Sequence, residues 1–313
     1  MKGLEICRNF YLEYGKPMIH EQFPEYENLI AVGLVGSGSE CYGFDDEISR
    51  DHDFEAGFCI FLPGEDIIDR KIEFQLERAY AKLPKEYEGL KRSLISPVGS
   101  NRHGVIRTAD FYREKIGSET GEMSISDWLT IDDFYLAEAT NGEVFFDPEG
   151  GFTRIRNNIS NMPEDIRLKK LAGNILLMAQ SGQYNYTRCL EHGESGAAQL
   201  AVFNYVQATM RSVFLLNKEY MPYYKWSFRA LRNLDKLSNL ADLLEFLLTS
   251  ENDEISSETK YSVIEDISSM LIDELQNQEI TKAICGDLEK HAYSINDFIK
   301  DSEIRNLNIL AGV

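Results

Sequence analysis

Apolar residues follow two different patterns in the two halves of the chain. Between residues 30 and 150, short apolar runs such as AVGLVG, GFCIFL, GVIRT and EVFF lie between turns rich in glycine, proline and acids, which is typical of buried strands. Apolar residues three or four apart over 65–84 and 126–142 predict helices among these strands. We therefore expect a mixed sheet with helices in the first half.

Beyond residue 150 the apolar period is helical throughout, which predicts a bundle. The turn 148–151 (PEGG) is the clearest boundary, and the acidic stretch 249–260 is expected to be a linker between helices. The expected fold class is α+β, with a mixed-sheet domain over 1–150 and an all-α domain over 151–313. The predicted bundle segments are 164–182, 197–217, 228–248, 261–276 and 295–311.

Composition narrows the classes of function. The 313 residues carry a formal net charge of −20 and no basic run, which argues against general nucleic-acid binding. No apolar run approaches the ~18 residues of a membrane helix, and the N-terminus lacks the pattern of a signal peptide. Five scattered cysteines without a CxxC pair predict free thiols, so we expect a cytoplasmic protein.

A glycine turn followed by acids stands out in GLVGSGSECYGFDDEISRDHDF (33–54). A Walker loop would need a lysine that this segment lacks. A dinucleotide fingerprint would need a third glycine where Cys41 stands. The order that is present is Gly38-Ser39 after a strand, and then Asp51-His52-Asp53 leading into the next strand.

That order resembles the signature of the DNA-polymerase-β-like nucleotidyltransferase superfamily. With NGEVFFD (141–147), FLLNKEYMPYYKW (214–226) and FRALRNL (228–234), the chain looks like a family of bacterial nucleotidyltransferase-like proteins from about residue 30 to about 235. The resemblance implies a minimal nucleotidyltransferase domain joined to a helical, substrate-binding domain. It does not supply a substrate.

The chemistry of these residues agrees with that resemblance. Glycines let the backbone approach the phosphates of a nucleotide, and the Ser39 hydroxyl can donate to them. Asp51 and Asp53, alternating along a strand, would face the same side with Cβ atoms ~7 Å apart. Two such carboxylates can share Mg²⁺, or Mn²⁺, and the cation offsets the cost of burying them. The alternative interpretation is a glycine turn followed by a solvated acidic loop.

The resemblance also implies a third carboxylate on a neighbouring strand. Asp110, which follows the strand GVIRT, is the first candidate, although aspartate there is also a common helix cap. Glu55 is the second candidate, on the same predicted strand as Asp53. If neither closes the site, the fold would bind a nucleotide without turning it over.

Three cations of the helical half are candidates for binding the nucleotide's phosphates. Arg188 lies in the polar segment YTRCLEHGES with His192 and Glu194, a segment that can also be an ordinary loop. Lys225 and Arg229 are four residues apart, so on a helix they share a face beside aromatic residues that can stack on a base. Alternatively, those aromatics belong to the core and the cations only reach out to water.

The sequence thus predicts a Mg²⁺-dependent nucleotidyltransferase that moves a nucleoside monophosphate from an NTP to an acceptor hydroxyl. The acceptor classes are a small molecule, a protein side chain or a tRNA end. The alternative is a non-catalytic nucleotide-binding or regulatory module, such as the nucleotidyltransferase-like half of a toxin–antitoxin pair.

Overall fold

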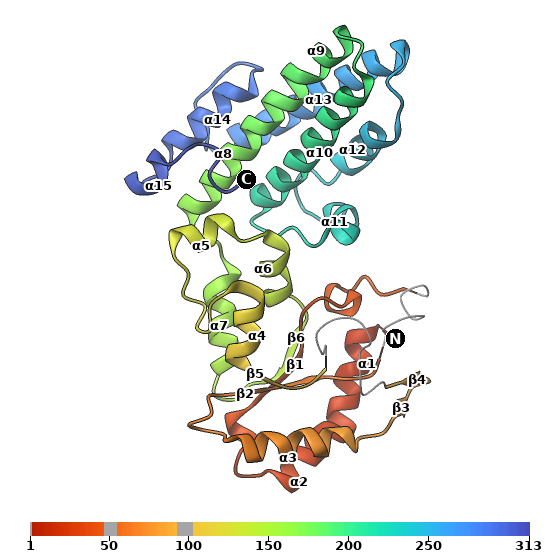
Figure 1. The fold of residues 1–313 in the computed structure, drawn as a ribbon, viewed down its shortest axis with the longest axis vertical. Coiled ribbons are helices and arrows are strands. Elements are labelled where there is room, and N and C mark those ends of the chain that lie inside the picture. Colours follow the sequence, from red (N-terminus) through yellow and green to blue (C-terminus); the bar gives the residue numbers. More distant parts are fainter. Residues whose placement is uncertain (1, 47–54, 93–102) are drawn as a thin grey trace. The chain divides into compact units, whose positions relative to one another are not determined.

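The computed structural model describes residues 2–46, 55–92 and 103–313 (Figure 1). The chain forms two compact units, which we call the sheet unit (1–123 with 135–161) and the helical unit (124–134 with 162–313). A mixed sheet with helices in one unit and helices alone in the other confirm the α+β class. The boundary expected at 148–151 falls inside the sheet unit, because the Phe152 ring packs 4.2 Å from that of Phe61 in the sheet.

The sheet unit has a four-stranded mixed sheet in the order β5-β2-β1-β6. Strand β1 pairs antiparallel with β2 and with β6, whereas β2 pairs parallel with β5. A short antiparallel pair, β3 and β4, stands apart from it. The bounds are α1 Gly3–Phe10, α2 Lys16–Gln22, β1 Ala31–Leu34, β2 Cys59–Leu62, α3 Arg70–Ala81, β3 Glu86–Tyr87, β4 Leu90–Lys91, β5 Gly104–Arg107, α4 Thr108–Ile116, α6 Asp133–Thr140, β6 Glu143–Phe146 and α7 Gly151–Ser160.

Strand β2 is buried on both sides, which explains its continuous apolar run. Ile60 and Leu62 join the core cluster that holds residues of α1, α2 and α3. Phe61 points the other way and packs edge-to-face on Phe111 of α4, with ring centroids 5.3 Å apart. Figure 1 shows α3 and α4 on opposite sides of the sheet. The strand is shorter than predicted, since residues 55–58 lie outside it.

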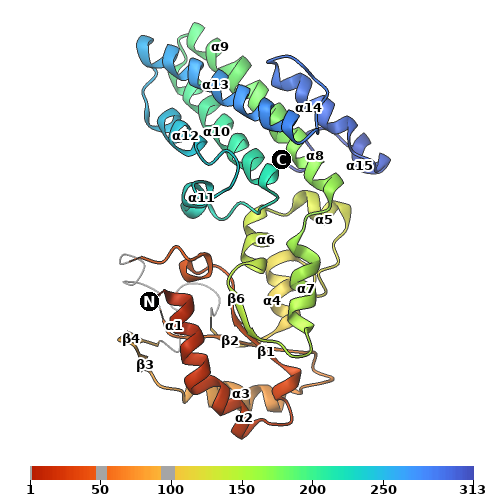
Figure 2. The ribbon, with the colours of Figure 1, turned by 180° about the vertical axis from the view of Figure 1, so that it is seen from behind.

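The helical unit is built around α8 and α10, which pack side by side (Figure 2). Helix α8 continues without a break through a π-helical segment, residues 179–185, into α9. The predicted single helix over 126–142 is two helices, α5 and α6, because Ile131 between them is extended. The bounds are α5 Ile125–Thr130, α8 Glu164–Met178, α9 Tyr186–Glu191, α10 Ser195–Asn217, α11 Tyr224–Leu231, α12 Leu240–Thr249, α13 Glu254–Asn277, α14 Leu288–Asp297 and α15 Ser302–Asn306.

The linker expected over 249–260 is shorter than predicted. Helix α13 already begins at Glu254, because the Asp253 side chain accepts hydrogen bonds from the Ile255 and Ser256 amides and caps the helix. The acids of this stretch therefore belong largely to a helix start.

Lysines are buried inside the helical unit, which the apolar period did not predict. Lys169 is fully buried, and its Nζ donates to Asn296 Oδ1 (2.9 Å) and to the Leu307 carbonyl (2.7 Å). Lys260, also fully buried, donates to Gln199 Oε1 (3.0 Å) and Asn252 Oδ1 (2.9 Å). Burial lowers the pKa of both ammonium groups, and these neutral oxygens offset part of the cost.

Within the described part of the chain, every helix is too short or too polar to cross a bilayer.

Candidate functional site

The topology of the sheet brings four chain segments to one edge, which we call the glycine-turn edge. Strand β1 ends there at Leu34 and runs on into the glycine turn, residues 35–38. Because β2 is antiparallel to β1, with Gly33 opposite Cys59, β2 begins at this edge. Strand β5 is parallel to β2, and β6 is antiparallel to β1, so both also begin there.

The glycine turn is held by the side chain of Asn141, just before β6. Gly36 N–H donates to Asn141 Oδ1 (2.8 Å), and Asn141 Nδ2 donates to the Gly36 carbonyl (2.7 Å). Gly36 has φ +117°, a conformation that favours glycine. Asn141 thus gives this turn the two hydrogen bonds that a neighbouring strand would otherwise supply.

Gly142, the residue after Asn141, also contacts the chain on both sides of the glycine turn. The Gly142 amide donates to the Cys41 carbonyl at 2.9 Å, and Gly142 lies so close to β1 that a Cβ would overlap the Leu34 carbonyl oxygen. Arg156 of α7 supports the same segment, since its Nη2 donates to the Thr140 carbonyl at 2.6 Å. By sequence, Asn141 and Gly142 are only the last residues of the helix predicted over 126–142, and the pattern does not indicate this role.

Gly38 and Ser39, the predicted phosphate-binding pair, lie where the glycine turn enters a 3-10 helix, Ser39–Tyr42. The Glu40 carboxylate is buried against Gly38, where a Cβ would overlap it. The Ser39 hydroxyl lies 3.4 Å from Glu40 Oε2. The Glu40 carboxylate therefore lies next to the two residues that were predicted to bind phosphate. The sequence motif did not indicate this.

The loop after the 3-10 helix is tied to the start of α1. Gly3 N–H donates to Asp45 Oδ2 at 3.0 Å, and Lys2 Nζ donates to the Gly43 and Asp45 carbonyls, each at 3.1 Å. Asp45 is buried, so this contact fixes where the chain leaves the glycine-turn edge.

Asp51 and Asp53, the predicted metal ligands, and His52 between them, lie outside the described residues. The described chain resumes at Glu55, two residues after Asp53 in the sequence, and leads into β2 at the glycine-turn edge. Gly57 lies against the His103 side chain, which would clash with a Cβ there, so the starts of β2 and β5 pack closely. Glu55, the second candidate for the third carboxylate, thus lies at the glycine-turn edge.

Asp110 lies at the opposite edge of the sheet. It sits in the first turn of α4, which follows the end of β5, and β5 begins at the glycine-turn edge. Its Oδ1 accepts from Arg113 Nη1 at 2.6 Å on an exposed helix face. The structure does not bring Asp110 together with Gly38 and Ser39.

The three predicted phosphate-binding cations of the helical unit are not brought together either. Arg188 is exposed in α9, before α10, and its guanidinium lies 4.9 Å from the Tyr184 ring. Lys225 and Arg229 are exposed on α11, after α10, and Lys225 lies 4.9 Å from the Trp226 ring. The 23 residues of α10 span roughly 35 Å, so Arg188 and α11 are near opposite ends of it.

The described residues contain no group of three His, Cys, Asp or Glu side chains that could hold a metal ion. Thiols close to the glycine turn are also poor ligands or nucleophiles in the folded protein. Burial raises the pKa of Cys7 and of Cys59 to about 12, and it raises that of Cys41 as well.

The helical unit contains a cavity of about 500 Å³ beside the start of α11. The segments 129–134 and 221–224 line it, together with α8 and α10. Lys170 of α8 fixes one wall, because its Nζ donates to Asp133 Oδ1 (2.9 Å) and to the Ile131 carbonyl (3.0 Å). The aromatic pair Tyr223 and Tyr224 belongs to this cavity, but the neighbouring Lys225 does not line it.

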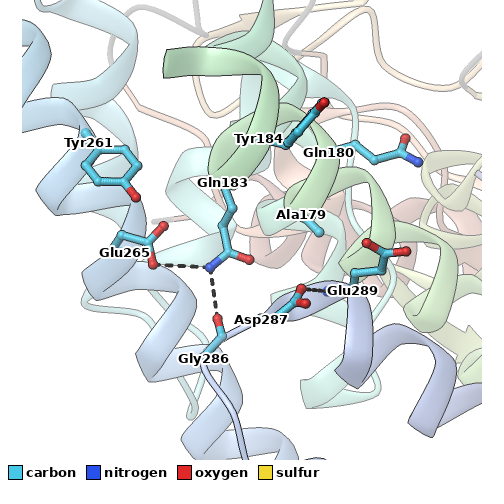
Figure 3. A pocket seen from close by; sticks show the side chains of 9 residues that line it. All are labelled: Ala179, Gln180, Gln183, Tyr184, Tyr261, Glu265, Gly286, Asp287 and Glu289. Atoms are coloured by element: carbon cyan, nitrogen blue, oxygen red, sulfur yellow. Dashed lines mark hydrogen bonds between the residues drawn. The ribbon is translucent and has the colours of Figure 1, made fainter. Parts of the chain in front are cut away.

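A second cavity of the same unit, about 630 Å³, lies where the π-helical segment meets α13 and the start of α14 (Figure 3). Gln183 Nε2 crosses it to Glu265 Oε2 (3.2 Å) and the Gly286 carbonyl (2.9 Å). Asp287 and Glu289 also line this cavity and make it acidic. Most of its polar groups already form hydrogen bonds with one another or, like Asp287, with the first backbone amides of a helix.

A family model described as "Domain of unknown function (DUF4037)" matches residues 128–227. A solved nucleotidyltransferase-like protein from Exiguobacterium sibiricum is 13% identical, with 91% of this chain and 90% of that chain covered and a TM-score of 0.38. A score of this size does not establish a common fold. No curated protein matches significantly.

Proposed function

We propose that this chain is a Mg²⁺-dependent nucleotidyltransferase that transfers a nucleoside monophosphate from an NTP to an acceptor hydroxyl. One observation carries the proposal: the glycine turn follows β1, and residues 55–58 lead into β2 at the same edge of the sheet, because β1 and β2 are antiparallel neighbours. Asp51 and Asp53 come shortly before residues 55–58 in the sequence. A sequence motif whose two halves lay at opposite edges could not form one site.

The residues of this edge have the chemistry that a metal-bound polyphosphate needs. Asp51 and Asp53 would hold the cation, since carboxylate and phosphate oxygens are the ligands that Mg²⁺ prefers. The cation would neutralise charge on the leaving pyrophosphate. Ser39 would donate its hydroxyl to a phosphate oxygen, with the turn kept in shape by Asn141.

The transfer is an in-line displacement. The acceptor oxygen forms a bond to the α-phosphorus, the bond from that phosphorus to the bridging oxygen breaks, and pyrophosphate leaves with the bonding pair. The acceptor proton passes to a carboxylate base. Glu55 stands at the glycine-turn edge, whereas Asp110 stands at the other edge, so we assign the base to Glu55. The net charge of −20 favours a small molecule or a protein side chain as acceptor over a long nucleic acid.

The test is pyrophosphate release from each NTP with Mg²⁺ and a pool of small-molecule and protein acceptors. Asp51→Asn with Asp53→Asn is expected to lower release at least 100-fold. Asp110→Asn is the matched comparison, because it removes a carboxylate at the opposite edge and should change release less than twofold. A loss with Asp110→Asn and none with the double variant would contradict the proposal.

One observation favours a second candidate, a module that binds nucleotide without transferring it. The buried Glu40 carboxylate occupies the turn beside Ser39 and would repel a phosphate placed there. On this alternative, nucleotides bind weakly, Glu40→Gln strengthens binding about tenfold, and no pyrophosphate is released with or without the substitution. Release by the wild-type chain would exclude it.

A further inference from the structure

The 500 Å³ cavity of the helical unit has the features of a ligand site independent of the glycine turn. Two neighbouring helices each line the cavity with residues four apart in sequence. They are Lys170 and Asn174 on α8, and Gln207 and Arg211 on α10. Side chains at this spacing lie on one face of a helix. All these residues belong to the helical unit. The volume is in the usual range for small-molecule sites.

Arg211 supplies an available positive charge in this cavity. The charge of Lys170 is neutralised by Asp133, 2.9 Å away, with both side chains largely buried. The partly buried Arg211 guanidinium makes no hydrogen bond or ion pair with any residue that the structure describes. Asp132, the remaining charged residue of the lining, is exposed, so water screens it. A guanidinium removed from water favours a carboxylate or phosphate partner.

Asn174 adds an unused hydrogen-bond acceptor. Its side chain is 2% exposed, and its Nδ2 donates to the Lys170 carbonyl at 2.8 Å. Its Oδ1 is buried and has no hydrogen-bond partner among the residues that the structure describes. Exchanging the two amide atoms would bring two oxygens together, so the orientation is fixed. A buried acceptor left in this state is costly, and a ligand N–H or O–H would satisfy it.

Aromatic residues form the third part of the cavity. The Tyr223 and Phe134 rings meet edge-to-face at 5.5 Å, and the Tyr224 ring lies 4.5 Å from that of Tyr223. Tyr224 remains 73% exposed and Tyr223 42% exposed, which leaves ring surface for a planar group to cover.

The segment that matches the family model, residues 128–227, contains the whole lining except Gly312 and Val313. The match therefore falls on the parts of the chain that build this cavity, although they are far apart in sequence.

We propose that this cavity binds a small organic anion that carries a planar ring and an N–H or O–H donor. Arg211 pairs with the anionic group, Asn174 Oδ1 accepts from the donor, and the aromatic wall covers the ring. The anion is a phosphate or a carboxylate, since a guanidinium fork suits both.

The test is calorimetric titration of the full chain with four probes. AMP and anthranilate combine ring, anion and N–H donor, with a phosphate and a carboxylate respectively. Adenosine lacks the charge, and inorganic phosphate lacks the ring. We expect AMP or anthranilate to bind at least tenfold more tightly than both incomplete probes, and the tighter of the two identifies the anion.

Variants locate the binding. Arg211→Met should lower the affinity for the tighter-binding probe at least tenfold, and Asn174→Leu should lower it about fivefold. Lys290→Met, an equal charge loss at an exposed position of α14, should change the affinity for that probe less than twofold. Melting temperatures show that each variant is folded. Equal binding of all four probes, no binding of any at millimolar concentration, or a folded Arg211→Met variant that binds as well as wild type would overturn the proposal.

Discussion

The Asn141 side chain bonds both polar atoms of the Gly36 backbone, across more than 100 residues of sequence. It accepts from Gly36 N–H and donates to the Gly36 carbonyl, at 2.8 and 2.7 Å. A turn with glycine at a positive φ has little stiffness of its own, so this amide holds the shape of the candidate phosphate site.

Asn141→Ala should therefore lower the free energy of unfolding by about 2 kcal/mol, since two partly buried backbone groups lose their partners. It should also weaken NTP binding. Urea unfolding measures the first effect and titration with nucleotide the second. Asn157→Ala on the exposed face of α7 is the control and should change neither. Unchanged unfolding in Asn141→Ala would mean that the turn is stable without the amide.

Two glycines with nearly the same backbone separate the effect of space from that of conformation. Gly142 has φ +63° and Gly150 has φ +68°, but only at Gly142 would a Cβ meet the backbone of β1. Gly150→Ala should cost about 1 kcal/mol, the cost of the left-handed conformation. Gly142→Ala should lower the free energy of unfolding by at least ~3 kcal/mol more than Gly150→Ala does, or prevent folding. Equal unfolding midpoints in urea for the two variants would contradict the close approach of β6 and β1.

The Lys170–Asp133 pair should behave as a buried ion pair. The two side chains are 5% and 11% exposed. Removing one charge by Lys170→Met or Asp133→Asn leaves the other without a partner, and should cost about 3–5 kcal/mol. The double variant Lys170→Met with Asp133→Leu should recover more than half of that loss.

The exposed pair of Arg113 and Asp110 gives the comparison, because Asp110→Ala should change the free energy of unfolding by less than about 0.5 kcal/mol. Urea unfolding curves measure all four variants. A small effect at Lys170 would show that water reaches this pair.

Buried thiols should make the protein less stable at high pH. In the unfolded chain Cys59 ionises near pH 9, whereas burial holds its pKa in the folded protein at about 12. The stability that the protonated thiol gives is complete below pH 9 and is lost as pH rises from 9 to 12. For Cys59 the loss at pH 10 is about 1 kcal/mol.

The measurement is urea unfolding at pH 7.5 and pH 10. The decrease between the two should be smaller in Cys59→Ala than in wild type, whatever the variant costs at both. Cys285→Ala is the control, since that thiol is exposed and should leave the decrease unchanged. The same decrease in all three proteins would contradict the shift.

The sequence predicted the strands of the mixed sheet because their runs are apolar and bounded by strong turns, as at β2, where Pro63 follows Leu62. It did not predict β3 and β4, which are two residues long and contain no apolar run. It also placed Gly38 and Ser39 after a strand, and they lie in the segment that follows β1. It could not predict on which edge Asp110 would lie, because that depends on β5 being parallel to β2, and a short run carries no direction.

Long-range partners were the other missing part. Asn141 is an ordinary helix-ending residue by local criteria, and only the fold brings it to Gly36. Lys170 and Arg211 lie within apolar helical patterns, where a cation is expected to reach water. Their positions in the cavity wall follow from the packing of α8 against α10, which the apolar period alone does not specify.

The two lysines sealed among neutral oxygens, Lys169 and Lys260, cannot pair with an anion from solution, although their charges still count in the formal net charge of −20. A negatively charged small molecule then approaches against a repulsive field, and added salt weakens that field. Encounter rates with free nucleotides or aromatic acids should accordingly rise with ionic strength, the reverse of what a basic protein shows.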